Sequence, residues 1–344
     1  MCAAMKAILH IGTPKTATTH VQSTFMANRQ TLQRAGIVYP DLLNKGPDHI
    51  TLFCAAHPYL HPFQDEYGIR TRDEIAPFRD NLRQLLQKQV AADPTALFIL
   101  SSENLSGNLQ GQAGMHILRE LLTAVFDDIK VVVYLRRQDE ALLSMYAEFM
   151  RKGFSGPTFD RFIERNLSDT AVVPYLDYDR LLRTWANVFG QENLVPRIFE
   201  SQRFVGGTVV SDFLSLLPGL PAGFAAGLQA RAPANTSLSA PALEFLRLIQ
   251  GVVPFGFKGN ANPERAALMP RINALPQLPK PVMSHVQAAR IMAHYMPGNQ
   301  KVAETYFAGG TAALFAQDVR SSDASNLGEL SLAQFREYFH AVFG

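Results

Sequence analysis

Three short apolar runs predict buried parallel strands. Each is continuously hydrophobic and rich in valine, isoleucine or leucine, which is typical of strands covered on both faces. The runs are Ala7 to Ile11, Ala96 to Leu100 and Ile129 to Leu135. A fourth expected strand, Asn193 to Phe199, comes further along the chain.

Segments with apolar residues at helical spacing alternate with these strands. We predict helices over Thr18 to Ala35, Asp73 to Val90, Gln138 to Lys152 and Asp179 to Phe189. Gly36 suits the position just after the first helix, because glycine readily takes the left-handed conformation needed there. The alternation predicts an α/β fold with a central parallel sheet flanked by helices.

The pattern changes near Pro218, where prolines and glycines cluster and after which no clear buried strand follows. The expected helices beyond this point are Ala240 to Gln250, Ser284 to Met296, Lys301 to Phe307 and Leu332 to Phe343. We therefore expect an α/β core over residues 1–217 and a mainly helical C-terminal part, 218–344, packed on the core within the same domain.

Composition narrows the classes of function. The 344 residues suffice for a sizeable core, and 47% hydrophobic with 18% charged residues is ordinary for a globular protein. A net charge of +2 gives no general attraction for nucleic acid or an anionic membrane. Any anion site must therefore be local.

Cysteines and the N-terminus bear on the compartment. Cys2 and Cys54 are the only cysteines, too few for a disulfide framework or a thiolate metal site. The sequence shows no signal-like segment and no run of about 18 apolar residues. We expect a cytoplasmic protein without a transmembrane segment. Whether Met1 or Met5 is the natural start stays open, as does the oligomeric state.

A loop with the composition of an anion site follows the first strand. From Gly12 to Thr19 it reads Gly-Thr-Pro-Lys-Thr-Ala-Thr-Thr and leads directly into a helix. Such a turn directs backbone N–H groups and the positive helix end at one point. Lys15 adds a charge, and Thr16, Thr18 and Thr19 add hydroxyl donors. The alternative for this loop alone is a threonine-capped turn with a solvated lysine.

A second candidate anion site lies at the end of the third strand. Arg136 ends that strand, and Ser144 follows eight residues later, about two turns into the next helix. The arginine and the serine hydroxyl could therefore converge on one phosphate.

Together these segments resemble those of sulfotransferases that use 3′-phosphoadenosine 5′-phosphosulfate (PAPS). Residues 8–19 resemble the family's 5′-phosphosulfate loop, whose core reads Pro-Lys-Ser/Thr-Gly-Thr-Thr, and residues 131–144 resemble its 3′-phosphate segment. Weaker similarity to the bacterial branch comes from Ser101 to Leu105, Trp185, Phe189-Gly190, Asn235 to Ile249 and Asn299 to Phe315.

The resemblance implies a P-loop-like sheet, PAPS as sulfuryl donor, PAP as product and no metal. Lys15 would stabilise charge on the leaving phosphate, and Arg136 and Ser144 would hold the 3′-phosphate. The residues that would hold the 5′-phosphosulfate are Pro14, Lys15, Thr16, Ala17, Thr18 and Thr19.

Ala17 departs from the family pattern, which has glycine there. Alanine would be strained if the position needs a positive φ, whereas it costs little in right-handed helical geometry. We expect the right-handed conformation.

An acceptor hydroxyl needs a general base. We predict Glu103, because it lies just past the carboxyl end of a buried strand, where open α/β sheets bind ligands. A structural turn carboxylate is the alternative role, and His49 is the next candidate base. His10 is expected to be a packed core residue, and prolines beside His57 and His61 argue against a helical metal pair.

Two other functions remain open. A P-loop kinase or nucleoside triphosphatase should show a Walker A lysine and a strand-end aspartate for Mg²⁺, and neither is evident. A non-catalytic relative that binds PAP or a glycan should have lost Lys15 or Glu103. The acceptor is not identified; a saccharide or glycolipid is our first expectation, by analogy alone.

Overall fold

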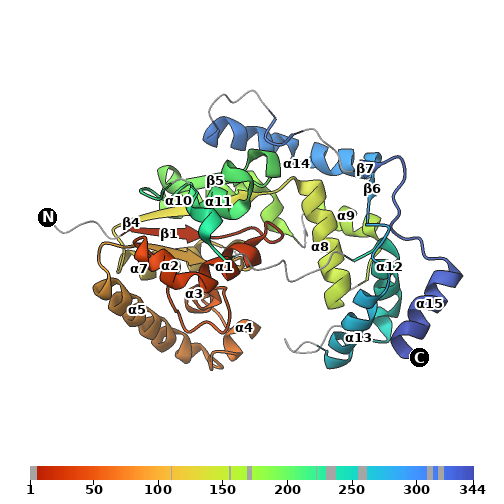
Figure 1. Ribbon diagram of the computed structural model, residues 1–344, viewed down its shortest axis with the longest axis horizontal. Helices are drawn as coiled ribbons and strands as arrows, with labels where there is room; N and C mark the ends of the chain where they lie inside the picture. The colour runs from red at the N-terminus through yellow and green to blue at the C-terminus, as the bar shows by residue number, and fades with distance from the viewer. Residues whose placement is uncertain are drawn as a thin grey trace. The chain divides into compact units, whose positions relative to one another are not determined.

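The computed structural model describes residues 6–109, 111–154, 156–168, 173–221, 223–229, 238–254, 262–307, 313–316 and 321–344 (Figure 1). By its internal contacts the chain forms two compact units. The first comprises residues 1–136, 177–232 and 298–315, and the second residues 137–176, 233–297 and 316–344. This division differs from the boundary expected at residue 217, because 137–176 group with the later helices and 298–315 with the sheet.

A parallel sheet forms the centre of the first unit (Figure 1). It has five strands in the order β2-β3-β1-β4-β5. Its strands are β1 (Lys6–His10), β2 (Ile37–Val38), β3 (Leu97–Ser101), β4 (Asp128–Leu135) and β5 (Leu194–Ile198). The predicted α/β class and the four predicted strands are confirmed, with ends that differ by one residue. The sequence analysis missed β2, since two residues carry too little pattern to stand out.

Helices cover both faces of this sheet. The face that carries Ile8 packs against α1 (Thr18–Ala27), α2 (Arg29–Arg34) and α11 (Val209–Leu214). The other helices of the unit are α3 (Ile50–Ala56), α4 (Pro62–Asp65), α5 (Ile75–Ala92), α6 (Asn104–Gly107), α7 (Gln112–Thr123) and α10 (Tyr178–Phe189). Of these, α10 packs against α7, β4 and β5.

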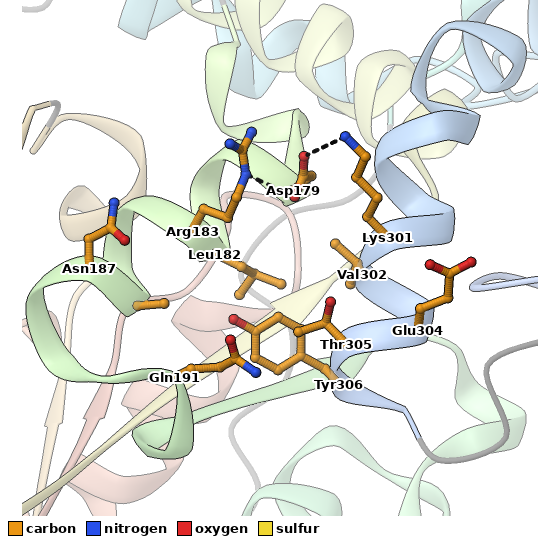
Figure 2. Close-up of a pocket in the computed structure, with 11 residues that line it drawn as sticks. Asp179, Leu182, Arg183, Asn187, Gln191, Lys301, Val302, Glu304, Thr305 and Tyr306 are labelled. Atoms are coloured by element: carbon orange, nitrogen blue, oxygen red, sulfur yellow. Dashed lines mark hydrogen bonds and ion pairs between the residues drawn. The ribbon is translucent and has the colours of Figure 1, made fainter.

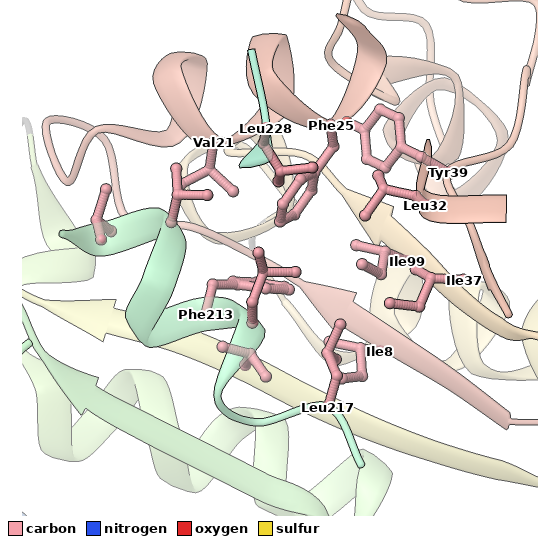
Figure 3. Close-up of a cluster of buried hydrophobic side chains, with 14 of the residues drawn as sticks. Ile8, Val21, Phe25, Leu32, Ile37, Tyr39, Ile99, Phe213, Leu217 and Leu228 are labelled. Atoms are coloured by element: carbon pink, nitrogen blue, oxygen red, sulfur yellow. The ribbon is translucent and has the colours of Figure 1, made fainter. Parts of the chain in front are cut away.

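A cluster of buried apolar side chains lies on the Ile8 face of the sheet. Phe25 of α1 and Phe213 of α11 are fully buried, with ring centroids 5.2 Å apart (Figure 3). Because successive side chains of a strand alternate between faces, His10 lies on the same face as Ile8. Its ring contacts that of Phe213 at 5.3 Å, so the cluster reaches the carboxyl end of β1.

The helix predicted over residues 18–35 is interrupted at Asn28. The Asn28 side chain donates to the Thr24 carbonyl at 2.8 Å and exchanges two hydrogen bonds with the Gln229 backbone, at 3.1 and 3.0 Å. An asparagine that bonds to nearby backbone in this way competes with helical geometry. Gly36 has φ +74°, as predicted for a residue that follows a helix end.

In the second unit the predicted helix over residues 138–152 is confirmed without change. Its elements are α8 (Gln138–Lys152), α9 (Phe159–Asn166), α12 (Ala240–Leu248), α13 (Pro263–Ala274), α15 (Leu332–Phe343) and a short parallel pair, β6 (Met283–Ser284) with β7 (Ser321–Ser322). Helix α14 (His285–Tyr306) contributes its first residues to this unit and its residues from Gly298 onward to the first. Two helices were predicted there, but α14 continues through Pro297, which removes only one backbone donor.

Candidate active site at the carboxyl edge of the sheet

The loop between β1 and α1 is tied to the neighbouring strand β4. Ile11 N–H donates to the Val132 carbonyl at 3.0 Å, and the Thr13 hydroxyl donates to the Tyr134 carbonyl at 2.6 Å. Thr16 closes a turn inside the loop by donating its hydroxyl to the Thr13 carbonyl at 2.6 Å. These bonds hold the loop at the carboxyl edge of the central strand, where open α/β sheets bind ligands.

The backbone of this loop is left-handed at three positions. Gly12, Lys15 and Ala17 have φ of +45°, +71° and +58°. The expectation that Ala17 is right-handed is therefore wrong. The conformation costs an L-residue about 1–2 kcal/mol. Left-handed residues between right-handed ones turn successive N–H groups toward one point, which makes an anion-binding concavity.

Three backbone N–H groups at the start of α1 have no acceptor among the described residues. They are the N–H groups of Ala17, Thr18 and Thr19, which donate to no backbone or side-chain acceptor in the described part of the chain. They belong to the cap and first turn of α1, where the helix dipole is positive. With Lys15 in the same loop, these donors fit a phosphate or sulfate group.

Two of the three candidate threonine hydroxyls in the loop already donate their proton to a protein acceptor. A hydroxyl carries one proton, and Thr16 uses its proton within the loop. Thr18 donates its proton to Oε2 of Glu103 at 3.0 Å. Thr19 is exposed, and its hydroxyl contacts no described partner. Of the three predicted hydroxyl donors, only Thr19 is open to an anion in this conformation.

Glu103 lies directly beside the loop. In addition to the contact with Thr18, a Cβ placed on Gly12 would lie 3.5 Å from the Glu103 Cα and Cβ atoms. Helix α6 begins at the next residue, and its Ser106 hydroxyl donates to the Gly12 carbonyl. The structure therefore brings the predicted base and the predicted anion loop together, although they are 85 residues apart at the Thr18 contact.

Arg136 links the end of β4 to the same loop. Its Nη1 donates to the Lys15 carbonyl at 3.0 Å, and its guanidinium lies 5.8 Å from the centroid of the Phe199 ring. The Tyr178 hydroxyl fixes its backbone by accepting from Arg136 N–H at 3.1 Å and donating to its carbonyl at 2.5 Å. Ser144 is a half-buried residue of α8 in the second unit. Its pairing with Arg136 stays a prediction.

His10 and His49 are buried, and their contacts fit a structural role. Nδ1 of His49 accepts from Ser101 N–H at 3.0 Å, and Nε2 lies 3.0 Å from the Pro40 carbonyl. Burial lowers the pKa of His49 to about 3, and that of His10 likewise to about 3. Because both nitrogens of His49 are engaged and its ring is fully buried, the geometry favours Glu103 over His49 as the base. The core position expected for His10 is confirmed.

Asp48 and Asn104 were missed in the sequence analysis, although each neighbours a residue singled out there. Nδ2 of Asn104 donates to Oδ2 of Asp48 at 3.3 Å. Burial raises the pKa of Asp48 to about 7, and the nearby charge of Glu103 adds to the increase. The available signal was their position in the sequence. Asp48 follows Pro47 and precedes the candidate base His49, and Asn104 directly follows Glu103.

A separate pocket of about 330 Å³ lies between α10 and the last turns of α14 (Figure 2). Three of its charged groups are paired with one another: Asp179 accepts from Arg183 at 3.0 Å and lies 3.9 Å from Lys301. None of the predicted site residues lines this pocket. The candidate active site is therefore at the sheet edge.

Comparison with known proteins gives limited similarity. No model of a protein family matches the chain. An uncharacterised protein of Archaeoglobus fulgidus is 33% identical over 88 residues, so the match spans 26% of this chain and 22% of the relative's length. The crystal structure of a sulfotransferase from Alicyclobacillus acidocaldarius aligns over 88% of this chain and 95% of that one, with 11% identity and a TM-score of 0.40.

Two further observations concern the described residues as a whole. None of their helices is both long and apolar enough to cross a membrane. Their His, Cys, Asp and Glu side chains form no group of three or more arranged to hold a metal ion.

Proposed function

We propose that this protein is a sulfotransferase that moves a sulfuryl group from PAPS to an acceptor hydroxyl. The observation that carries the proposal is the bond from Arg136 Nη1 to the Lys15 carbonyl at 3.0 Å. It joins the two segments that resemble the family's 5′-phosphosulfate and 3′-phosphate sites. The unpartnered N–H groups at the start of α1 support the same assignment.

Each residue has a defined role in this proposal. The N–H groups of Ala17, Thr18 and Thr19 hold the 5′-phosphosulfate, and Lys15 offsets the negative charge that develops on the phosphate oxygen released. Arg136 and Ser144 hold the 3′-phosphate, which distinguishes PAPS from ATP. Bound PAPS supplies an electron-poor sulfur for in-line displacement by the acceptor oxygen.

Glu103 accepts the proton of the acceptor hydroxyl as the new S–O bond forms and the bond to the phosphate oxygen breaks. Its Oε2 already accepts the Thr18 proton, which orients the carboxylate relative to the loop. PAP and the sulfated acceptor are the products. Glu103→Gln should therefore slow the chemical step far more than it weakens PAP binding, as single-turnover rates and calorimetry would show.

Ligand-dependent melting tests the proposal first. A ligand at about one hundred times its dissociation constant adds roughly 2.7 kcal/mol to the folded state, which raises the melting temperature by several degrees. We expect PAP to produce this shift and ATP with Mg²⁺ to produce none. The variant Lys15→Ala removes the charge assigned to the anion loop. Its matched control is Lys88→Ala, which removes an exposed lysine of α5.

A P-loop nucleoside triphosphatase or kinase is the second candidate. The contact from the Thr18 hydroxyl to the Glu103 carboxylate favours it, because P-loop enzymes hold Mg²⁺ with a loop hydroxyl and a strand-end carboxylate. Stabilisation by ATP with Mg²⁺ alone would select this function. Stabilisation by PAP without transfer to a broad acceptor panel would instead select a non-catalytic PAP-binding protein.

For the acceptor we propose a saccharide or a glycolipid precursor. The proposal rests on analogy with the family rather than on a described pocket. An acceptor panel of saccharides, glycolipids, small phenols and tyrosine peptides, assayed with PAPS, would identify the class.

A further inference from the structure

The pocket between α10 and the last turns of α14 lies within the first unit and contains none of the residues assigned to the proposed reaction (Figure 2). Its volume of about 330 Å³ is at the lower end of the range in which proteins bind small molecules, roughly 300–1,000 Å³. The cavity therefore has room for a ligand of the size of a mono- or disaccharide, a nucleoside or a short peptide.

Both walls of this pocket are held by close packing. On the α10 side, Trp185 is fully buried and stacks on Phe189, with ring centroids 5.4 Å apart. On the α14 side, Gly298 allows the helix to approach the start of α10. A Cβ placed on Gly298 would lie 3.4 Å from the Asp179 Cβ atom and 3.7 Å from Oδ1 of Asp177. The pocket therefore lies between two helices in contact, and its shape exists before a ligand binds.

The charged groups give the pocket no excess charge. Asp179 accepts from Arg183 and lies 3.9 Å from Lys301, and Glu304 accepts from Gln300 Nε2 at 3.0 Å. The lining thus contains two cations and two carboxylates, whose formal charges cancel. Phosphates, nucleotides and charged peptides would gain no net attraction from such a lining, which favours a neutral ligand.

Uncharged polar groups of the lining are the ones open to a ligand. Within the described part of the chain, no hydrogen bond engages the side-chain amides of Asn187 and Gln191 or the hydroxyls of Thr305 and Tyr306. An amide offers two donors and an acceptor oxygen, and a hydroxyl both donates and accepts. These groups come from both walls, so a ligand with many hydroxyl groups would find partners on either side.

An apolar surface lies among these polar groups. Leu182 of α10 and Val302 of α14 are buried side chains of the lining. The Tyr306 ring extends from α14 toward α10 (Figure 2). The negative face of an aromatic ring attracts weakly positive C–H groups, such as those on one face of a sugar ring. A ligand that fits this pocket should therefore combine an apolar face with a rim of hydroxyl groups.

We propose that the pocket between α10 and α14 is a binding site for a neutral saccharide, separate from the candidate active site. The C–H face of the sugar packs on the Tyr306 ring, and its hydroxyl groups bond to Asn187, Gln191 and Thr305. The saccharide is bound here and not chemically changed. Binding does not require sulfuryl transfer, so it does not depend on the proposed sulfotransferase function.

Saturation-transfer NMR with the whole protein tests for binding. The saccharide probes are glucose, galactose, N-acetylglucosamine, lactose and cellobiose, each at a concentration that reveals millimolar affinity. Adenosine and a neutral tripeptide test the class of ligand. We expect transfer to at least one saccharide. Transfer to none of the probes, or only to adenosine or the tripeptide, would overturn the proposal.

Two substitutions in the lining test the assigned contacts. Gln191→Ala removes an exposed amide, and Tyr306→Leu removes the aromatic ring but keeps an apolar side chain. Each should raise the dissociation constant of the saccharide about 2- to 10-fold. The matched controls are Gln87→Ala in α5 and Tyr59→Leu, both at exposed positions of the same unit outside the pocket. Equal affinities in the lining variants and their controls would contradict the assigned contacts.

A blocked pocket tests the location without reference to any single hydrogen bond. Ala186 lines the cavity, and Ala186→Phe places a ring inside it. This variant should abolish saccharide binding, whereas Ala91→Phe, at an exposed position of α5, should leave it unchanged. Saccharide binding that survives in Ala186→Phe would place the ligand elsewhere and overturn the proposal.

A saccharide that binds as the acceptor at the carboxyl edge would give a different pattern. Its affinity would fall in Glu103→Gln and stay the same in Gln191→Ala, which would overturn this inference and support the proposed function. We expect the reverse, with binding that also persists in the presence of saturating PAP. If PAP does not bind but Gln191→Ala weakens saccharide binding, the sulfotransferase proposal fails and the second site stands.

Discussion

The apolar cluster and the carboxyl edge are both built on strand β1, but the first is closely packed and the second holds strained backbone. Around Ile8, the rings of Phe25 and Phe213 are fully buried in ordinary contact (Figure 3). Beyond the end of β1, Lys15 and Ala17 hold left-handed backbone. Such strain persists only where the surrounding structure holds it in place. The stability of the apolar cluster therefore allows the carboxyl edge to hold strained backbone and hydrogen-bonding groups in place for a ligand.

The largest expected effect comes from breaking the cluster. Phe213→Ala should lower the free energy of unfolding by about 3–5 kcal/mol, because it leaves a cavity beside Phe25 and His10. Chemical denaturation would measure the loss. Leu60→Ala, an exposed site in the same unit, should change stability little. Equal losses of unfolding free energy in the two variants would contradict the special contribution of the apolar cluster to stability.

Lys15→Ala should break the edge without affecting the cluster. We expect transfer to fall about 100- to 1000-fold, as when a preorganised charge-stabilising group is removed. Alanine keeps a Cβ at a position already left-handed, so the melting temperature of the free protein should not change. Turnover that stays at the wild-type level would exclude the assigned role of Lys15.

Arg136→Ala should weaken PAP binding by about 10- to 100-fold, the usual cost of losing a charge-assisted contact. Adenosine 5′-phosphate lacks the 3′-phosphate, so its affinity should change much less. Calorimetry with both ligands separates the two contributions. Equal losses for the two would mean that Arg136 acts only by holding the Lys15 carbonyl.

The smallest expected effect tests the strain itself. Ala17→Gly removes the cost of a left-handed alanine, about 1–2 kcal/mol, from the folded state. The greater freedom of glycine stabilises the unfolded chain by about 0.4–1 kcal/mol and so offsets part of this gain. A net gain of up to about 1.6 kcal/mol in the free energy of unfolding should follow, measured by denaturation. Ala91→Gly, at an exposed position in the right-handed helix α5, should have the opposite sign. A loss of stability in Ala17→Gly would show that the loop is not strained.

Sequence patterns determined the parallel sheet, because continuous runs of branched apolar residues leave few alternatives to a strand covered on both faces. They also indicated the loop from Gly12 to Thr19 and the strand-end position of Glu103, since both follow directly from where a strand stops. The 138–152 helix was predicted to the residue, because a glycine, Gly153, follows it and favours a helix end. In the structure Gly153 is left-handed, with φ +83°.

Only the tertiary structure decided what depends on contacts between distant segments. The handedness of Ala17 follows from how the loop is bonded to β4, and the break at Asn28 from its bonds to Gln229. The proximity of Asp48 to Glu103 arises because His49 attaches to Ser101, 52 residues away. Local propensity carries no information about such pairings, since they exist only once the strands are assembled.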